Sequence, residues 1–166
     1  MLVVTVETPI GKVRVELGEK GVTRLRLPHV GGHDNDRPEG FRGGSGAGTD
    51  GERREADRVR EQLAQYFRGG RREFSIPLDL RGTDFQVRVW RAVSKIPYGT
   101  TASYADAARV VGRPRAVRAV GSAVGANPVP ILVPCHRVIG SSGALTGYGG
   151  GLEMKRWLLR LEGVAA

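Results

Sequence analysis

Residues 127–140 read NPVPILVPCHRVIG, and this stretch holds the only cysteine of the chain, Cys135. A lone cysteine forms no internal disulfide and no metal site built from several cysteines. Pro134 precedes it, His136 follows it, and the apolar run before it resembles a strand. Because an adjacent base helps to generate the reactive thiolate, we expect any chemistry of this protein to run through Cys135. The Cys-His pair alone also allows an inert, buried cysteine.

Length and charge set the broad class of the protein. A chain of 166 residues can bury a core in one domain or in two small ones. No apolar run approaches the roughly 20 residues that span a bilayer, and residues 1–6 lack the basic start of a signal peptide. With a free thiol, these features predict a cytoplasmic protein without a membrane partner. The net charge of +9 favours nucleic acid, although a GC-rich genome would also favour arginine, and only four of the 26 basic residues are lysine.

The first part of the chain, residues 1–80, predicts a small α/β domain. Within residues 2–27, apolar residues such as Val13 and Val15 alternate with charged ones, the period of half-buried strands. Thr49 and Glu52 have the spacing of a capping box, which predicts a helix through Phe67. Residues 74–80 alternate again and predict a further strand. Between these elements, residues 31–51 contain eight glycines and predict a flexible loop. Nothing in this part suggests chemistry.

The second part, residues 81–166, predicts a mostly α-helical domain. Asp84 is the expected cap of a helix that ends at Val93, and residues 152–161 form a last helix. That last helix is expected to bury four apolar side chains, those of Met154, Trp157, Leu158 and Leu161. Between these two helices, residues 104–111 and a second helix from Pro114 to Gly125 flank a glycine-containing turn. This pair is a helix-turn-helix candidate, and an ordinary packed helix pair is the alternative.

The motifs together resemble a known family. The run from Pro134 to Val138, preceded by residues 125–128 and followed by residues 148–151, is similar to the O6-alkylguanine-DNA alkyltransferases, the methylated-DNA–protein-cysteine methyltransferases. The resemblance is nearly continuous from Phe85 to Gly163, whereas residues 1–80 resemble the family's N-terminal domain only in outline. It implies DNA repair by irreversible, single-turnover transfer of the alkyl group of O6-alkylguanine, and of O4-alkylthymine, to Cys135. No cofactor is implied.

The resemblance also implies a partner and a role for each site residue. The partner is double-stranded DNA that contains alkylated guanine, bound in the minor groove by a monomer, with the damaged base flipped out. His136 would take the thiol proton through a water, Glu162 would orient the imidazole, and Asn127 would brace the turn before the cysteine. The base would be bound by Tyr104, Val138, Tyr148 and Gly149. The DNA would be contacted by Arg118, which fills the space of the flipped base, and by Ser103, Arg115 and Ala119.

The sequence departs from the family pattern in two features, and two other functions compete with alkyl transfer. Many members have serine where this chain has Gly149, so one side-chain donor is lost. No metal is expected, because a second cysteine is lacking and His29 and His33 lie in or beside the loop. One rival is a damage-recognising DNA-binding module without transfer, but proteins of that kind lack the reactive cysteine. The other is a Cys-His hydrolase, which leaves the arginine-bearing helix pair unexplained.

Overall fold

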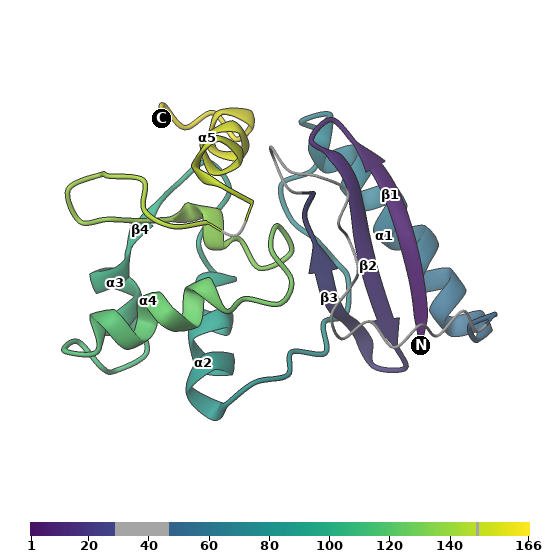
Figure 1. Ribbon diagram of the computed structural model, residues 1–166, viewed down its shortest axis with the longest axis horizontal. Helices are drawn as coiled ribbons and strands as arrows, with labels where there is room; N and C mark the ends of the chain where they lie inside the picture. The colour runs from purple at the N-terminus through teal and green to yellow at the C-terminus, as the bar shows by residue number, and fades with distance from the viewer. Residues whose placement is uncertain (29–46, 149) are drawn as a thin grey trace.

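The computed structural model describes residues 1–28, 47–148 and 150–166 of the chain. A three-stranded sheet with one long helix forms the first half, and a group of shorter helices forms the second (Figure 1). The two halves lie side by side and are joined by an extended connection (Figure 1). Most of the predicted loop at residues 31–51 lies outside the described residues. None of the described helices is long and apolar enough to cross a membrane.

The sheet of the first half is antiparallel. Its strands β1 (Leu2–Thr8), β2 (Gly11–Gly18) and β3 (Gly21–Arg26) follow one another in the order β1-β2-β3. Val13, Val15 and Leu17 are fully buried, as their alternation with charged residues predicts. In the register, Val15 lies opposite Val4 and Val13 opposite Val6, so one face of the sheet is a continuous apolar surface.

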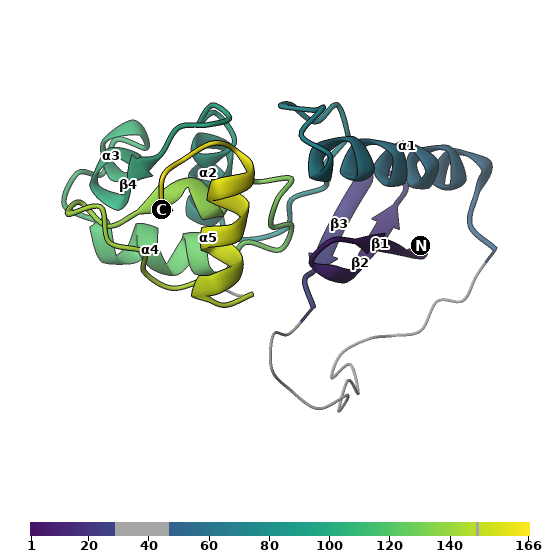
Figure 2. The same cartoon turned by 90° about the horizontal axis from the view of Figure 1, so that it is seen from above.

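Helix α1 (Asp50–Phe67) covers that face (Figure 2). The capping box predicted from the sequence is present: Thr49 Oγ1 accepts from Glu52 N–H at 3.1 Å, and Glu52 Oε2 accepts from Thr49 N–H at 2.9 Å. The helix buries side chains at helical spacing, which are Ala56, Val59, Leu63, Tyr66 and Phe67.

The prediction of a strand at residues 74–80 is wrong. This segment runs beside β3 and forms one bridge, in which Val22 N–H donates to Pro77 C=O and Asp79 N–H donates to Val22 C=O, each at 2.9 Å. Pro77 has no N–H, so it cannot continue a ladder in both directions. The alternation of apolar residues therefore reflects packing against the core rather than a full strand.

The second half contains four helices and a two-stranded parallel sheet among the described residues. These elements are α2 (Asp84–Val93), β4 (Ala102–Ser103), α3 (Tyr104–Val110), α4 (Val117–Gly125), the 3-10 turn η1 (Cys135–Arg137), β5 (Val138–Ile139) and α5 (Leu152–Leu161). Helix α2 packs against α4, and Trp90 Nε1 donates to Ala123 C=O at 2.7 Å across a buried contact. This bond ties the position of α4 to α2.

Three helix details differ from the sequence predictions. The cap of α2 is Thr83, whose hydroxyl accepts from Gln86 N–H, and Asp84 is the first helical residue. Helix α4 begins at Val117, because residues 113–116 form a turn in which Ala116 N–H donates to Arg113 C=O. In α5, Trp157 is 37% exposed whereas Lys155 is fully buried, so the buried face is rotated from the predicted one.

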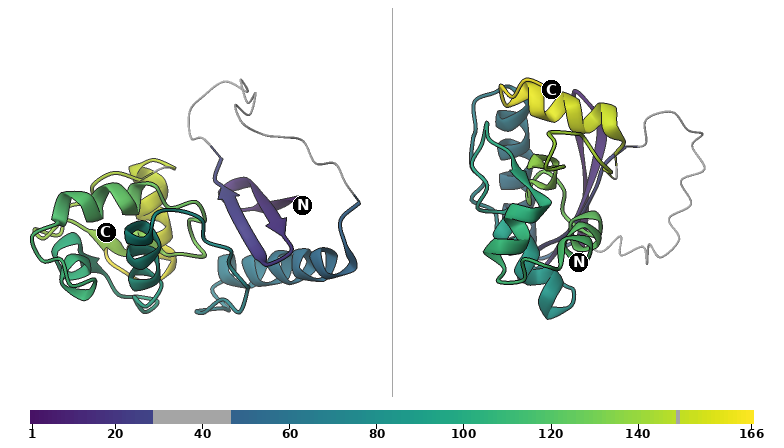
Figure 3. Two further views of the ribbon diagram at one scale, coloured as in Figure 1. Left: turned by 90° about the horizontal axis from the view of Figure 1, so that it is seen from below. Right: turned by 90° about the vertical axis from the view of Figure 1, so that its left-hand side faces the viewer.

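The two halves contact each other through side chains and backbone. Phe67 of α1 lies 6.0 Å from Trp157 of α5, measured between ring centroids. Tyr66 packs edge-on against Tyr98, which precedes β4. Leu25 N–H of β3 donates to Pro128 C=O at 2.9 Å, which joins the sheet to the segment leading to Cys135. Figure 3 shows these halves from two further sides.

Candidate active site

Cys135 begins η1 and is buried, with 6% of its surface exposed. Its N–H donates to Val133 C=O at 2.8 Å. The segment before it is not the strand that its composition suggests. Val133 N–H donates to Val129 C=O, and Ile131 between them has a positive φ of 72°, which is unusual for a β-branched side chain. Such strained backbone costs on the order of 1–3 kcal/mol and is commonly found at functional sites.

The side chain of Asn127 spans this turn. Its Nδ2 donates to Val133 C=O at 2.9 Å, and its Oδ1 accepts from Val129 N–H at 3.0 Å. Both bonds lie within the segment that presents Cys135, and Asn127 lines the same cavity as the thiol. The amide therefore closes the turn and also lies beside the Cys135 thiol.

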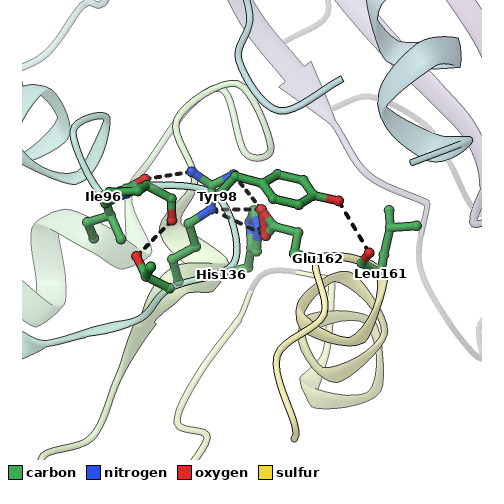
Figure 4. A network of polar contacts seen from close by, with 8 residues as sticks. Ile96, Tyr98, His136, Leu161 and Glu162 are labelled. Atoms are coloured by element: carbon green, nitrogen blue, oxygen red, sulfur yellow. Dashed lines mark hydrogen bonds and ion pairs between the residues drawn. The ribbon is translucent and has the colours of Figure 1, made fainter. Parts of the chain in front are cut away.

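The two residues that follow Cys135 form a buried charged network with Glu162 (Figure 4). His136 Nε2 lies 2.7 Å from Glu162 Oε2. Arg137 Nε donates to Glu162 Oε1 at 2.8 Å, its Nη2 also donates to this oxygen, and its Nη1 donates to Ile96 C=O at 2.6 Å. His136 Nδ1 is buried and has no hydrogen-bond partner among the residues that the structure describes. One imidazole nitrogen is thus fixed by a carboxylate, and the other is available to a proton donor.

Burial controls the protonation of this group. It raises the pKa of the Cys135 thiol to about 11, against the opposing effects of Asn127 and Lys155. Burial also lowers the pKa of His136, against the opposing hydrogen bond and charge of Glu162, and the positive charges of Arg137 and Lys155 add to the lowering. For Glu162, burial acts to raise the pKa, but hydrogen bonds from His136 and Arg137 outweigh it and lower the pKa. At neutral pH the arrangement is therefore a thiol, a neutral imidazole and a carboxylate paired with arginine.

Acidification is expected to lower the free energy of unfolding. Unfolded histidine titrates near 6.5, whereas the pKa of folded His136 lies lower, so below about pH 6.5 the unfolded chain binds a proton that the native chain does not. Glu162, whose pKa is lowered from 4.5, adds a loss of the same sign as the pH falls further. Urea unfolding at about pH 7.5 and 5.5 measures the change. His136→Gln should reduce the loss in the upper part of this window, and an unchanged loss in that variant would contradict the assignment.

Cys135 lines a cavity of about 310 Å³. Tyr104 of α3, Gly121 and Val124 of α4, and Tyr148 form other parts of its wall. The Tyr104 hydroxyl accepts a hydrogen bond from Thr146 Oγ1 at 3.2 Å. The volume is close to the lower end of the roughly 300–1,000 Å³ that ligand pockets usually have. It suits one small planar ligand better than a large one.

The predicted base-binding residues are partly brought together. Tyr104 and Tyr148 lie at the cavity, and burial raises the pKa of the Tyr148 hydroxyl, which keeps it a neutral donor. Val138 lies in β5, which pairs in parallel with β4, so the residue before α3 and the residues after the cysteine are adjacent. Gly149 lies outside the described residues.

The predicted DNA-contacting residues lie on or beside α3 and α4. Ser103 caps α3 by accepting from Asp106 N–H at 3.0 Å, a structural role that the sequence analysis did not assign to it. Arg115, Arg118 and Ala119 are exposed, and the first of these precedes α4 in the turn. The ring of Tyr104 lies beside Gly121 of α4, where an added Cβ would be 3.8 Å from Tyr104 Cδ1. Arginines therefore surround the start of α4 on the surface.

The sequence analysis assigned no role to several residues of the site, among them Arg137, Lys155 and Leu27. Lys155 is fully buried in α5, and its Nζ donates to Val138 C=O at 2.7 Å and to Thr146 C=O at 2.8 Å. Lys155 thereby links Val138, just after the cysteine turn, to Thr146, near the end of the loop that follows. Leu27, from the end of the N-terminal sheet, lines the cavity beside Cys135. An ordinary lysine on a helix and an ordinary leucine after a strand carry no local signal of such positions.

Comparison with known proteins gives a consistent result. Residues 84–164 match the family described as 6-O-methylguanine DNA methyltransferase, DNA binding domain. The chain is 48% identical over 165 residues to a methylated-DNA–protein-cysteine methyltransferase of Mycolicibacterium paratuberculosis, covering 95% of this chain and 90% of the relative. It is 44% identical to the constitutive protein of that description from Bacillus subtilis, with 97% and 94% covered.

Among solved structures, the fold is similar to that of Mycobacterium tuberculosis OGT in complex with DNA. The TM-score is 0.75 at 46% sequence identity, and the match covers 95% of this chain and 90% of the OGT chain. The similarity therefore includes the N-terminal sheet as well as the helical half, and confirms the predicted combination of an α/β part with a mostly helical part.

Proposed function

Because this chain belongs to the methylated-DNA–protein-cysteine methyltransferases and repairs DNA by alkyl transfer, we propose that Cys135 is its alkyl acceptor. The observation that carries the proposal is the placement of the only thiol in the wall of a cavity, next in sequence to His136, which is paired with Glu162. The substrate is O6-alkylguanine in duplex DNA, and O4-alkylthymine is a second substrate of the same kind. A module that only recognises damage does not need such a thiol.

The chemical step is a displacement at the alkyl carbon. The sulfur of Cys135 forms a bond to that carbon, and the bond between the carbon and guanine O6 breaks. With a pKa of about 11, roughly one thiol in ten thousand is ionised at pH 7. A base must therefore take the proton as the sulfur attacks. His136 Nδ1 fits this role through a bridging water, because Nε2–H donates to Glu162 and leaves Nδ1 as an acceptor.

Groups in the other walls of the cavity are suited to stabilise the leaving guanine. Its oxygen and ring nitrogen become negatively charged as the bond breaks, so hydrogen-bond donors aimed at them stabilise the transition state. The hydroxyl of Tyr104 is suited to donate to the ring nitrogen. The family resemblance assigns the oxygen to backbone N–H groups near Gly149, which lies outside the described residues. The carbonyls of Cys135 and Val138 are suited to accept from the exocyclic amine.

The exposed arginines around the start of α4 support a proposal for the DNA-binding mode. We assign these two helices as a helix-turn-helix that a monomer places in the minor groove. A base inside the duplex cannot reach a buried thiol, so the damaged nucleotide is flipped into the cavity at a cost of a few kcal/mol. Arg118 is exposed near the start of α4 and is suited to fill the space left in the stack. A cytoplasmic location stays a prediction of the sequence.

A single incubation tests the proposed function. The protein is mixed with a duplex that contains O6-methylguanine, and its intact mass and peptide masses are measured. The expected result is one added methyl group per protein, located on the peptide that contains Cys135. A methyl group on another residue, or an unchanged protein mass beside unmodified DNA, would contradict the proposal.

Arg118→Ala is expected to slow repair of the duplex far more than reaction with the free base O6-benzylguanine. Only the duplex requires the flipped state to be held open, and flipping costs a few kcal/mol that Arg118 would help to offset. Single-turnover rates on the two substrates measure the difference. Arg68→Ala is a matched control, because Arg68 is an exposed arginine at the end of α1 in the other half. Equal losses on both substrates would refute the role of Arg118.

A further inference from the structure

Leu27 belongs to the N-terminal half, yet it lines the cavity that contains Cys135. The other lining residues all come from residues 104–148 of the helical half. Leu27 is half-buried and packs against the hydrophobic core. Since the sheet carries no reactive group of its own, its contribution to the cavity is an apolar wall.

Contacts on both sides of Leu27 fix its position. Two residues before it, Leu25 N–H donates to Pro128 C=O, next to Asn127 of the active-site turn. One residue after it, Pro28 lies against Gly11, where an added Cβ would come within 3.1 Å of the proline ring. The chain around Leu27 is therefore anchored both to the active-site segment and to its own sheet.

The backbone on the opposite side approaches Leu27 closely. Gly150 is buried, and a Cβ built there would lie 3.2 Å from Leu27 Cδ1 and would overlap Met154 Sδ. Little free space therefore separates Leu27 from the backbone of Gly150. An alkyl substituent that reaches this wall of the cavity meets the apolar side chain of Leu27.

We propose that Leu27 is a specificity-determining residue that limits the size of the alkyl group transferred to Cys135. The reacting carbon must come within about 3–3.5 Å of the sulfur, so the rest of the alkyl group has to occupy the cavity around the cysteine. In a cavity of about 310 Å³ that also holds the base, added carbons compete with the wall for space. The N-terminal half thereby takes part in substrate choice. This inference rests on the proposed function of Cys135.

The test compares two alkyl groups in the same duplex sequence, O6-methylguanine and O6-benzylguanine, by single-turnover rates. Leu27→Ala should raise the benzyl-to-methyl rate ratio by about tenfold, the scale of discrimination that one methylene provides in an apolar pocket. Leu27→Phe should lower the ratio. Leu78→Ala and Leu78→Phe are the matched controls, because Leu78 is also a half-buried leucine of the N-terminal half packed on the core, but it does not line the cavity. They should leave the ratio unchanged.

A binding measurement tests the role of Leu27 independently of alkyl transfer. In a Cys135→Ser background, binding of the free base O6-benzylguanine should weaken with Leu27→Phe and not with Leu78→Phe. An unchanged rate ratio in both Leu27 variants, or equal losses with both alkyl groups, would overturn the inference and leave Leu27 a structural residue. A wild-type protein that transfers no methyl group would overturn the proposed function instead, while the binding measurement would still decide the role of Leu27.

Discussion

Cys135→Ser is expected to abolish alkyl transfer and to leave the affinity for duplex DNA within a few-fold of the wild-type value. A serine hydroxyl is far less acidic and less nucleophilic than a thiol, and the neutral imidazole of His136 is too weak a base to ionise it in this buried position. Arg115, Arg118 and Ala119 are exposed, and none of these residues proposed to contact DNA lines the cavity of Cys135. Transfer is measured by methyl incorporation and binding by a salt titration on the same duplex, with affinity falling as salt rises.

The wild-type protein should transfer alkyl groups in a single turnover. A thioether is chemically stable, and the chain has no second thiol to which the alkyl group could pass. Each molecule should therefore react once, giving a burst of one methyl group per protein and no later turnover. Several methyl groups removed from DNA per protein molecule, or residual transfer by Cys135→Ser, would contradict this reading of the site.

The sequence predicted those elements whose signals are local. The alternation around Val13 and Val15 and the capping box of Thr49 and Glu52 are decided by neighbouring residues, and both are present in the structure. The Cys-His pair is also local, and resemblance to the family supplied its distant partner Glu162. Spacing alone could not have done so, because 26 residues separate the histidine from the carboxylate.

The sequence failed where tertiary contacts outweigh local pattern. Lys155 was assigned to no site, since a charged residue on a helix normally faces water. Its ammonium group is instead buried because two backbone carbonyls, of Val138 and Thr146, accept from it. Ile131 gave no sign of its positive φ, which the surrounding turn imposes on it. Leu27 looks like any strand-end leucine until the two halves are packed together.

Contacts between the two halves bear on the predicted division into two domains. The predicted boundary at residue 80 lies between the part with β1–β3 and α1 and the part with α2–α5, and the sequence indicated no chemistry in residues 1–80. The structure places Leu27 at the cavity and joins Leu25 to Pro128 by a backbone hydrogen bond. Tyr66 of α1 also packs on Tyr98, whose ring lies under the guanidinium of Arg137. The first half therefore supports the active site on two sides.

Arg137→Met is expected to cause the largest loss of stability among the substitutions considered. The side chain of Glu162 is fully buried, and its charge is balanced chiefly by the guanidinium of Arg137. Removing one partner of a buried ion pair leaves the other charge uncompensated, at a cost of about 3–5 kcal/mol. The carboxylate then has one remaining partner, His136, at 2.7 Å. We therefore expect the pKa of His136 to rise in this variant, because the imidazolium now balances Glu162.

This coupling predicts a change in activity that a purely structural defect would not produce. A protonated His136 cannot accept the thiol proton, so transfer by Arg137→Met should be slow at neutral pH and should recover as the pH rises. Urea unfolding measures the stability, and single-turnover rates between about pH 6 and 9 measure the recovery. The double variant Arg137→Met/Glu162→Gln removes both charges, so it should regain much of the lost stability and lose the displaced pH profile. If the single variant instead loses activity equally at every pH, Arg137 supports the fold without controlling the protonation of His136.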